Sequence, residues 1–163
     1  MNKNRRNIQL LTQGAIIAAL YVALTMLFQP ISFGAIQFRI SEALTNTPLF
    51  TLAAIPGLFI GCILSNLSGG AVIIDVIIGS LATLIGVILG YMLRKNRWLV
   101  PIPAVIANAL IIPLVLIYGY GEPLPYYVLV IYIGAGEIVG CYILGEILAQ
   151  ALITRRIFDN KTK

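Results

Sequence analysis

The pattern of hydrophobic positions is dominated by long apolar runs separated by short polar stretches. Four of these runs cover residues 8–28, 71–93, 99–118 and 127–153. Each contains about 20 residues or more, which is the length an α-helix needs to cross a hydrocarbon layer about 30 Å thick. The pattern therefore predicts an all-α membrane protein with at least four crossings.

The segment between the first two of these runs is harder to assign. Residues 42–67 are mostly apolar but contain the tripeptide Ile-Pro-Gly at 55–57, where a helix could be interrupted. The segment is either one kinked crossing or two short helices, over 42–54 and 57–67. A helix of about 11 residues, at 1.5 Å per residue, is too short to cross alone. Neighbouring helices would have to shield such a pair from lipid.

Basic residues decide between these alternatives. They gather near the N-terminus, at 94–97 and after residue 154. Two short helices put all three clusters on one side of the membrane, which agrees with the excess of Lys and Arg in cytoplasmic loops. One kinked crossing would put the middle cluster on the opposite side. We therefore predict a single domain, residues 1–163, that forms a six-transmembrane-helix bundle with cytoplasmic N- and C-termini.

Composition supports this class and excludes several others. The 163 residues are 60% hydrophobic and 10% charged, and the mean hydropathy is +0.97. The net charge of +5 comes from clusters that flank apolar runs, so nucleic-acid binding is not indicated. The chain has no histidine and no G-x-x-x-x-G-K-[ST] motif, which excludes H-E-x-x-H metalloproteases, serine–histidine hydrolases and P-loop ATPases. We predict a non-enzymatic membrane protein with no catalytic residue, metal site or cofactor of its own.

A few polar residues lie within the predicted crossings, where they normally face a cavity or a partner because their transfer into lipid is expensive. Glu137 lies about ten residues into the last helix, and Asn108 reaches a similar depth in the fifth. Glu42 opens the second helix and Asp75 lies one turn into the fourth. Two alternatives stay open: Asp75 could satisfy the start of its helix, and Glu42 could pair with Arg39, three residues earlier.

Glu146 belongs to a different face of the last helix. It follows Glu137 by nine residues, which is half a rotation, so the two carboxylates cannot face one pocket. We assign Glu146 to a structural or partner contact.

The first helix carries a stripe of small residues at intervals of four: Ala15, Ala19 and Ala23. Such a stripe lets a second helix approach closely. Packing inside the bundle and docking of another subunit both explain it.

Several motifs resemble one known family over nearly the whole chain. They are IQFRISEALTNTPLF, AIPGLFIGCILSN, DVIIGSLATLIG, and the later NALI and GAGE. These segments are similar to the QueT family, the substrate-binding S-components of energy-coupling-factor (ECF) transporters. The resemblance implies a bundle of the ECF S-component type in the bacterial plasma membrane. It also implies a transmembrane coupling subunit and two ATPase subunits that use ATP, with Ala15, Ala19 and Ala23 docking on the partner.

The resemblance further implies uptake of a queuosine precursor, a 7-deazaguanine such as 7-aminomethyl-7-deazaguanine or queuine. A carboxylate can accept the N–H groups of the ring edge, an amide or guanidinium can donate to its carbonyl, and a second carboxylate can pair an aminomethyl cation. We expect Glu137 or Glu42 at the ring edge and Asp75 at the cation. The predicted binding residues are Arg39, Glu42, Asn66, Asp75, Asn108, Glu137 and, stacking on the ring, Tyr132. Another vitamin-like ligand, or a stand-alone small carrier, remains an alternative.

Overall fold

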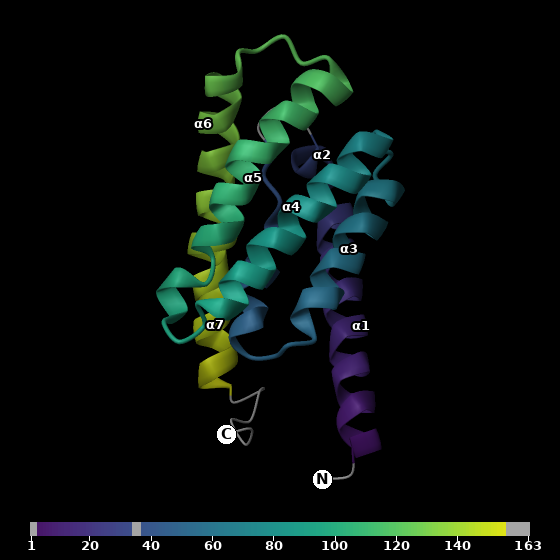
Figure 1. The fold of residues 1–163 in the computed structure, drawn as a ribbon, viewed down its shortest axis with the longest axis vertical. Helices are drawn as coiled ribbons and strands as arrows, with labels where there is room; N and C mark the ends of the chain where they lie inside the picture. Colours follow the sequence, from purple (N-terminus) through teal and green to yellow (C-terminus); the bar gives the residue numbers. More distant parts are fainter. Residues whose placement is uncertain (1–2, 34–36, 156–163) are drawn as a thin grey trace.

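A computed structural model describes residues 3–33 and 37–155, and within this part of the chain it contains helices and no strand. The α-helices pack as a bundle (Figure 1). Their bounds are α1 Lys3–Leu27, α2 Gln29–Ser32, α3 Ala54–Ser68, α4 Ile73–Met92, α5 Ile102–Val115, α6 Tyr126–Glu137 and α7 Gly145–Thr154. The predicted all-α class is confirmed.

Shorter 3₁₀ and π segments extend or connect these helices. The 3₁₀ segments are η1 Ile40–Leu49 and η2 Arg97–Leu99, and the π segments are η3 Leu116–Tyr120 and η4 Ile138–Leu144. Because η3 continues α5, and η4 joins α6 to α7, the described residues form four helices that are long and apolar enough to cross a membrane. These are Asn4–Leu27, Ile73–Met92, Arg97–Tyr120 and Tyr126–Thr154.

The second predicted helix is the main difference from the sequence-based expectation. Residues 42–54 were expected to be helical up to a break at 55–57, but the structure has a 3₁₀-helix that ends at Leu49. The predicted break at 55–57 is wrong, because Pro56 lies in the first turn of α3. Backbone N–H groups in the first turn of a helix have no hydrogen-bond partner within the helix, so a proline is tolerated there. The chain turns instead between η1 and α3.

The 3₁₀ form of η1 follows from its own residues. The hydroxyl of Thr45 donates to the carbonyl of Glu42 at 2.6 Å, and that of Thr47 donates to Leu44 at 2.7 Å. Both bonds span three residues, and Pro48 removes one N–H from the last turn. All side chains of residues 41–48 are buried, so this irregular backbone is surrounded by protein, as a membrane interior requires.

Glycines allow the helices around η1 to approach closely. A Cβ at Gly57 on α3 would lie 2.7 Å from the carbonyl oxygen of Gly14 on α1, and one at Gly61 would lie 2.9 Å from the Cβ of Tyr21. Tyr21 is thereby held in the core beside Leu58. The internal contact of α1 thus uses the face of Gly14 and Tyr21.

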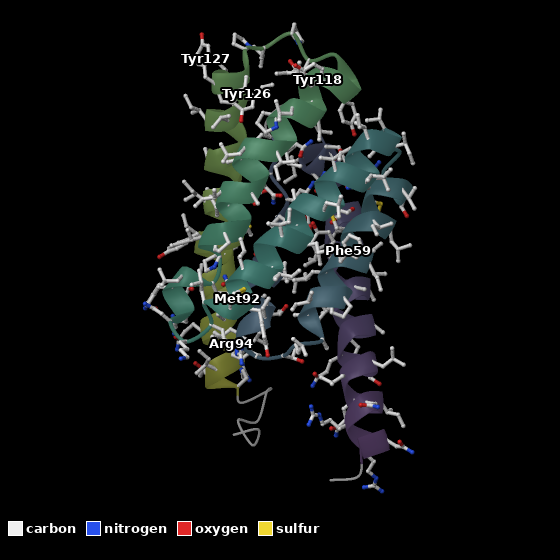
Figure 2. The ribbon with its side chains drawn as sticks, in the orientation of Figure 1. Phe59, Met92, Arg94, Tyr118, Tyr126 and Tyr127 are labelled. Atoms are coloured by element: carbon white, nitrogen blue, oxygen red, sulfur yellow. The ribbon has the colours of Figure 1, made fainter. Side chains whose placement is uncertain are left out.

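The two ends of the bundle differ in chemistry. Figure 1 shows the start of α1, the α4–α5 connection and the end of α7 at the same end of the molecule. Figure 2 shows Arg94 near this end and Tyr118, Tyr126 and Tyr127 at the opposite one. This placement agrees with basic cytoplasmic flanks and an aromatic belt on the other side. The count of six crossings and the cytoplasmic termini stay predictions, because η1 and α3 are both too short to span a bilayer alone.

Candidate functional site

The interior of the bundle holds an unusual concentration of polar side chains in two adjoining centres. The first, the arginine centre, is formed by Arg39, Asn66, Asp75 and Tyr120. The second, the carboxylate centre, is formed by Tyr21, Glu42, Asn108, Glu137 and Cys141. Arg39 and Glu42 connect them, because Glu42 N–H donates to the carbonyl of Arg39 at 3.1 Å in the first turn of η1.

In the arginine centre, Asp75 is fully buried in the first turn of α4. One of its oxygens, Oδ2, accepts a hydrogen bond from the Tyr120 hydroxyl at 2.8 Å and lies 4.0 Å from Nη2 of Arg39. The Asn66 amide, at the end of α3, donates to the backbone carbonyl of Asp75 at 3.4 Å. This centre therefore pairs one cation with one anion.

Arg39 is held in place by contacts on its other side. Its Nε donates to the carbonyl of Ser32 at 3.2 Å, and its guanidinium lies 5.2 Å from the centre of the Phe33 ring. Only 5% of the residue is exposed. A guanidinium so deeply buried keeps its charge, and the charge must be met by Asp75 and its surroundings.

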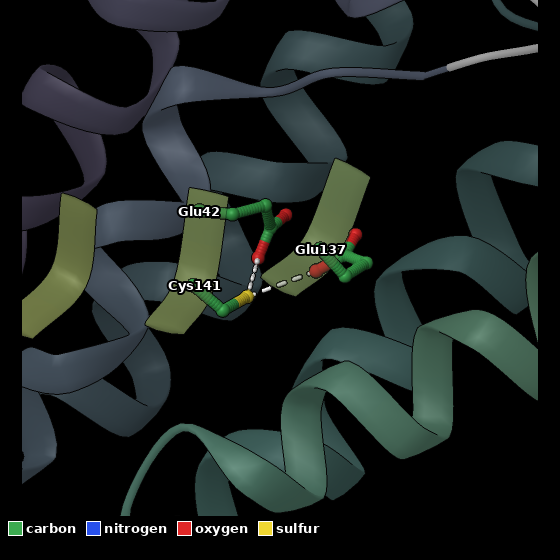
Figure 3. Close-up of side chains that lie close together, drawn as sticks. All are labelled: Glu42, Glu137 and Cys141. Atoms are coloured by element: carbon green, nitrogen blue, oxygen red, sulfur yellow. Dashed lines mark hydrogen bonds between the residues drawn. The ribbon is translucent and has the colours of Figure 1, made fainter. Parts of the chain in front are cut away.

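In the carboxylate centre, Glu42 and Glu137 converge on the thiol of Cys141 (Figure 3). The thiol donates to Glu137 at 2.9 Å and more distantly to Glu42 at 3.8 Å. The Tyr21 hydroxyl donates to the other oxygen of Glu42, and the Asn108 amide lies beside Glu137. One oxygen from each carboxylate and the thiol sulfur lie within 4.8 Å of one another.

The helix containing Glu137 is shaped to accept η1. The π segment η4 follows Glu137 directly, and the Asn46 amide of η1 donates to the carbonyl of Cys141 within it at 2.9 Å. A Cβ at Gly140 would lie 3.0 Å from the carbonyl of Arg39. Turns of the π type within α-helices are rare and are frequently found at functional sites.

Several buried polar atoms in and beside these centres have no hydrogen-bond partner within the described residues. They are Nη2 of Arg39, Oδ1 of Asn66, Oδ1 of Asp75, Oγ of Ser80 and Oδ1 of Asn108. Leaving such atoms unpaired costs free energy, so native proteins rarely do it without a ligand, water or functional reason. These five atoms are one donor, three acceptors and one hydroxyl that can be either. Arg39 directly precedes η1, and the other four side chains lie on α3, α4 and α5.

The chain was compared with known proteins. The model of the family described as QueT transporter matches residues 11–154. The chain belongs to the QueT transporter family.

One curated relative is similar in sequence to this chain over a shorter region. The Queuosine precursor transporter QueT of Lactococcus lactis subsp. cremoris (strain MG1363) is 47% identical over 81 residues, which are 48% of this chain and 47% of that protein. The match thus spans about half the length of the curated relative. No solved structure gives a significant match. A family of transporters, together with four long apolar helices, makes this chain a multi-pass protein of the bacterial plasma membrane and not an enzyme.

The structure brings most of the predicted binding residues of this QueT family member together. Six are buried in the two centres: Arg39, Glu42, Asn66, Asp75, Asn108 and Glu137. Tyr132 is not among them, because 40% of it is exposed while Leu129, Ile133 and Glu137 form the buried face of α6. Arg39 faces Asp75 rather than pairing with Glu42. The role of these six residues in binding stays a prediction.

Three residues of the centres were missed by the sequence analysis: Tyr21, Tyr120 and Cys141. Tyr21 and Thr25 share one face of α1 at a spacing of four, and the Thr25 hydroxyl donates to Ser41 of η1 at 2.7 Å. This polar pair within an apolar run was the available signal for Tyr21. Tyr120 lies in a polar stretch between two apolar runs and Cys141 lies within an apolar run, and neither position indicates a hydrogen bond to a buried carboxylate.

The alanine stripe of α1 points away from the bundle. Ala15, Ala19 and Ala23 are exposed, whereas Gly14 and Ala18 on the other face are buried against α3. Internal packing therefore does not account for the stripe.

Proposed function

We propose that the chain is the substrate-binding S-component of an ECF transporter that imports a queuosine precursor, a 7-deazaguanine such as 7-aminomethyl-7-deazaguanine or queuine. Family membership supports a transport role. The name of the Lactococcus lactis relative, a queuosine precursor transporter, supports the class of substrate. The motifs shared with ECF S-components support the coupling to an energising module.

The unpaired buried atoms of the arginine centre carry the proposal. The edge of a 7-deazaguanine offers a ring N–H and an amine as donors, next to a carbonyl acceptor. Within the described residues, three atoms of the centre have no hydrogen-bond partner: the acceptors Oδ1 of Asp75 and Oδ1 of Asn66, and the donor Nη2 of Arg39, which lies 4.0 Å from Oδ2 of Asp75. The numbers of donors and acceptors match, and a ring that lacks one of these groups would leave a buried atom unpaired, which gives specificity.

The exposed face of α1 supports a partner subunit. Only 22% of the most apolar window of α1 is buried in the bundle, against 33% to 61% for the other three long helices. Ala15, Ala19 and Ala23 lie on this open face, and small residues let a second helix approach closely in a membrane. We assign this face to the transmembrane coupling subunit, which in turn binds two ATPase subunits that hydrolyse ATP.

Ligand binding by the purified protein tests the substrate class. We expect 7-aminomethyl-7-deazaguanine or queuine to raise the unfolding temperature in detergent, and thiamin, riboflavin and biotin to leave it unchanged. The Asp75→Asn variant should lose this shift, because the carboxylate that accepts from the ring edge is gone. Stabilisation by one of the vitamins and by no 7-deazaguanine would instead show an S-component for another ligand.

Uptake into cells tests the coupling. Uptake should require the ATPase pair, and Ala19→Leu should abolish it while the purified variant still binds ligand. Ala135→Leu is the matched control, since Ala135 is an exposed alanine on α6 and should tolerate the change. Uptake that persists without any ATPase would show a stand-alone carrier.

A further inference from the structure

We propose that Glu42, Glu137 and Asn108 form a subsite for a protonated primary amine of the transported ligand. This inference rests on the proposed function and narrows its substrate class. The preferred substrate is a 7-deazaguanine that carries an aminoalkyl cation, and 7-deazaguanines with a neutral side group bind more weakly. The sequence analysis had placed the cation at Asp75. We assign the cation to the carboxylate centre instead, because Asp75 already faces Arg39.

Charge is the first reason. Glu42 and Glu137 are 1% and 6% exposed, and no Lys or Arg nitrogen in the described part of the chain lies within 4.0 Å of either carboxylate. Two buried carboxylates this close repel each other strongly, so they must share a proton or receive a cation. In the arginine centre, by contrast, the negative charge of Asp75 is compensated by Arg39.

Geometry is the second reason. An ammonium group has three N–H donors and no acceptor. Two acceptors bound to one tetrahedral ammonium at charge-assisted distances lie about 4.6 Å apart. The two carboxylates present a pair of oxygens no more than 4.8 Å apart. In the ligand-free protein the Cys141 thiol is the donor that faces both carboxylates. A thiol is a weak donor, and an ammonium group would take its place.

A third acceptor for the ammonium group is the side-chain oxygen of Asn108, which is not part of the acidic pair. Asn108 is 3% exposed and belongs to a different helix, α5. Its amide lies beside Glu137, yet its Oδ1 has no hydrogen-bond partner within the described residues. A third N–H of the ammonium would satisfy it. The adjoining arginine centre would then hold the ring edge of the same ligand.

A matched pair of ligands tests the subsite in the purified full-length protein. The probes are 7-aminomethyl-7-deazaguanine and the neutral 7-hydroxymethyl analogue, which has the same ring and a side group of similar size. The wild type should bind the amine at least about tenfold more tightly. Glu137→Gln should weaken the amine by about 10- to 100-fold, the loss typical of a hydrogen bond to a charged group, and the neutral analogue by less than about threefold.

Two further variants make the test decisive. Glu42→Gln should give the same selective loss, so the conclusion survives if one variant fails to fold. Glu146→Gln is the matched control, because Glu146 lies on the same continuous helix but pairs with Arg97, and it should bind both ligands as the wild type does.

Three results would overturn the inference. If Glu137→Gln and Glu42→Gln weaken both ligands equally, the carboxylates hold the shared ring and not the amine. If the wild type binds both ligands with equal affinity, the amine has no subsite, although the proposed function stands. Binding of neither ligand by the wild type would reject the proposed function itself, together with this inference.

Discussion

Two carboxylates on the same continuous helix, Glu137 and Glu146, are buried to almost the same degree, with 6% and 8% exposed, but have opposite surroundings. Glu146 accepts from Nε of Arg97 at 3.1 Å and lies 3.1 Å from its Nη2, while Nη1 of the same guanidinium donates to Gln150 at 2.7 Å. Glu137 has a second carboxylate and a thiol as its neighbours.

The difference separates a structural carboxylate from a functional one. The Glu146 pair joins the α4–α5 connection to α7 at the basic end of the bundle, and its charge is compensated. The predicted structural role of Glu146 agrees with this contact. Glu137 has no ion-pair partner within the described residues, and a buried carboxylate without one is expected where a ligand supplies the positive charge.

The largest effect on stability should follow from breaking the compensated pair in the arginine centre. Asp75→Asn leaves the Arg39 guanidinium buried without its nearest anion. Removing one partner of a buried ion pair costs about 3 kcal/mol or more of unfolding free energy. Chemical denaturation of the ligand-free protein in detergent measures this loss. An unchanged denaturation midpoint would mean that Arg39 is compensated elsewhere.

A smaller loss is expected at the basic end. Glu146→Gln removes the anion that faces Arg97, but 28% of the Arg97 side chain is exposed, so water compensates part of the loss. We expect a decrease of about 1 kcal/mol, below the value for a fully buried charged hydrogen bond. Ligand affinity, measured in parallel, should not change. A loss of affinity in this variant would show that Glu146 also contributes to ligand binding and would contradict the contrast with Glu137.

The smallest effect on stability should come from the carboxylate centre itself. Glu137→Gln keeps the side-chain volume and removes one of two like charges, so the ligand-free protein should be within about 0.5 kcal/mol of the wild type or slightly more stable. Thermal and chemical unfolding would check this. Marked destabilisation would show that Glu137 is structural, like Glu146, and would remove the main argument for an amine subsite.

The long apolar runs were sufficient to predict the four long helices, because a run of about 20 apolar residues has few other stable states in a protein of this composition. They were not sufficient for residues 40–49. Residues 41–48 of that segment are all buried by other parts of the chain, so the backbone form depends on Thr hydroxyls, a proline and surrounding helices, not on exposure to lipid.

The sequence by itself identified which polar residues were out of place in an apolar chain, and six of the seven proposed binding residues are indeed buried together. Only the tertiary structure decided how their charges combine. Arg39 was three residues from Glu42 along the chain, yet it faces Asp75 on another helix, and Glu42 faces Glu137, 95 residues away. Electrostatic compensation acts through space over a few ångströms, and the packing that sets those distances comes from helices distant in the sequence.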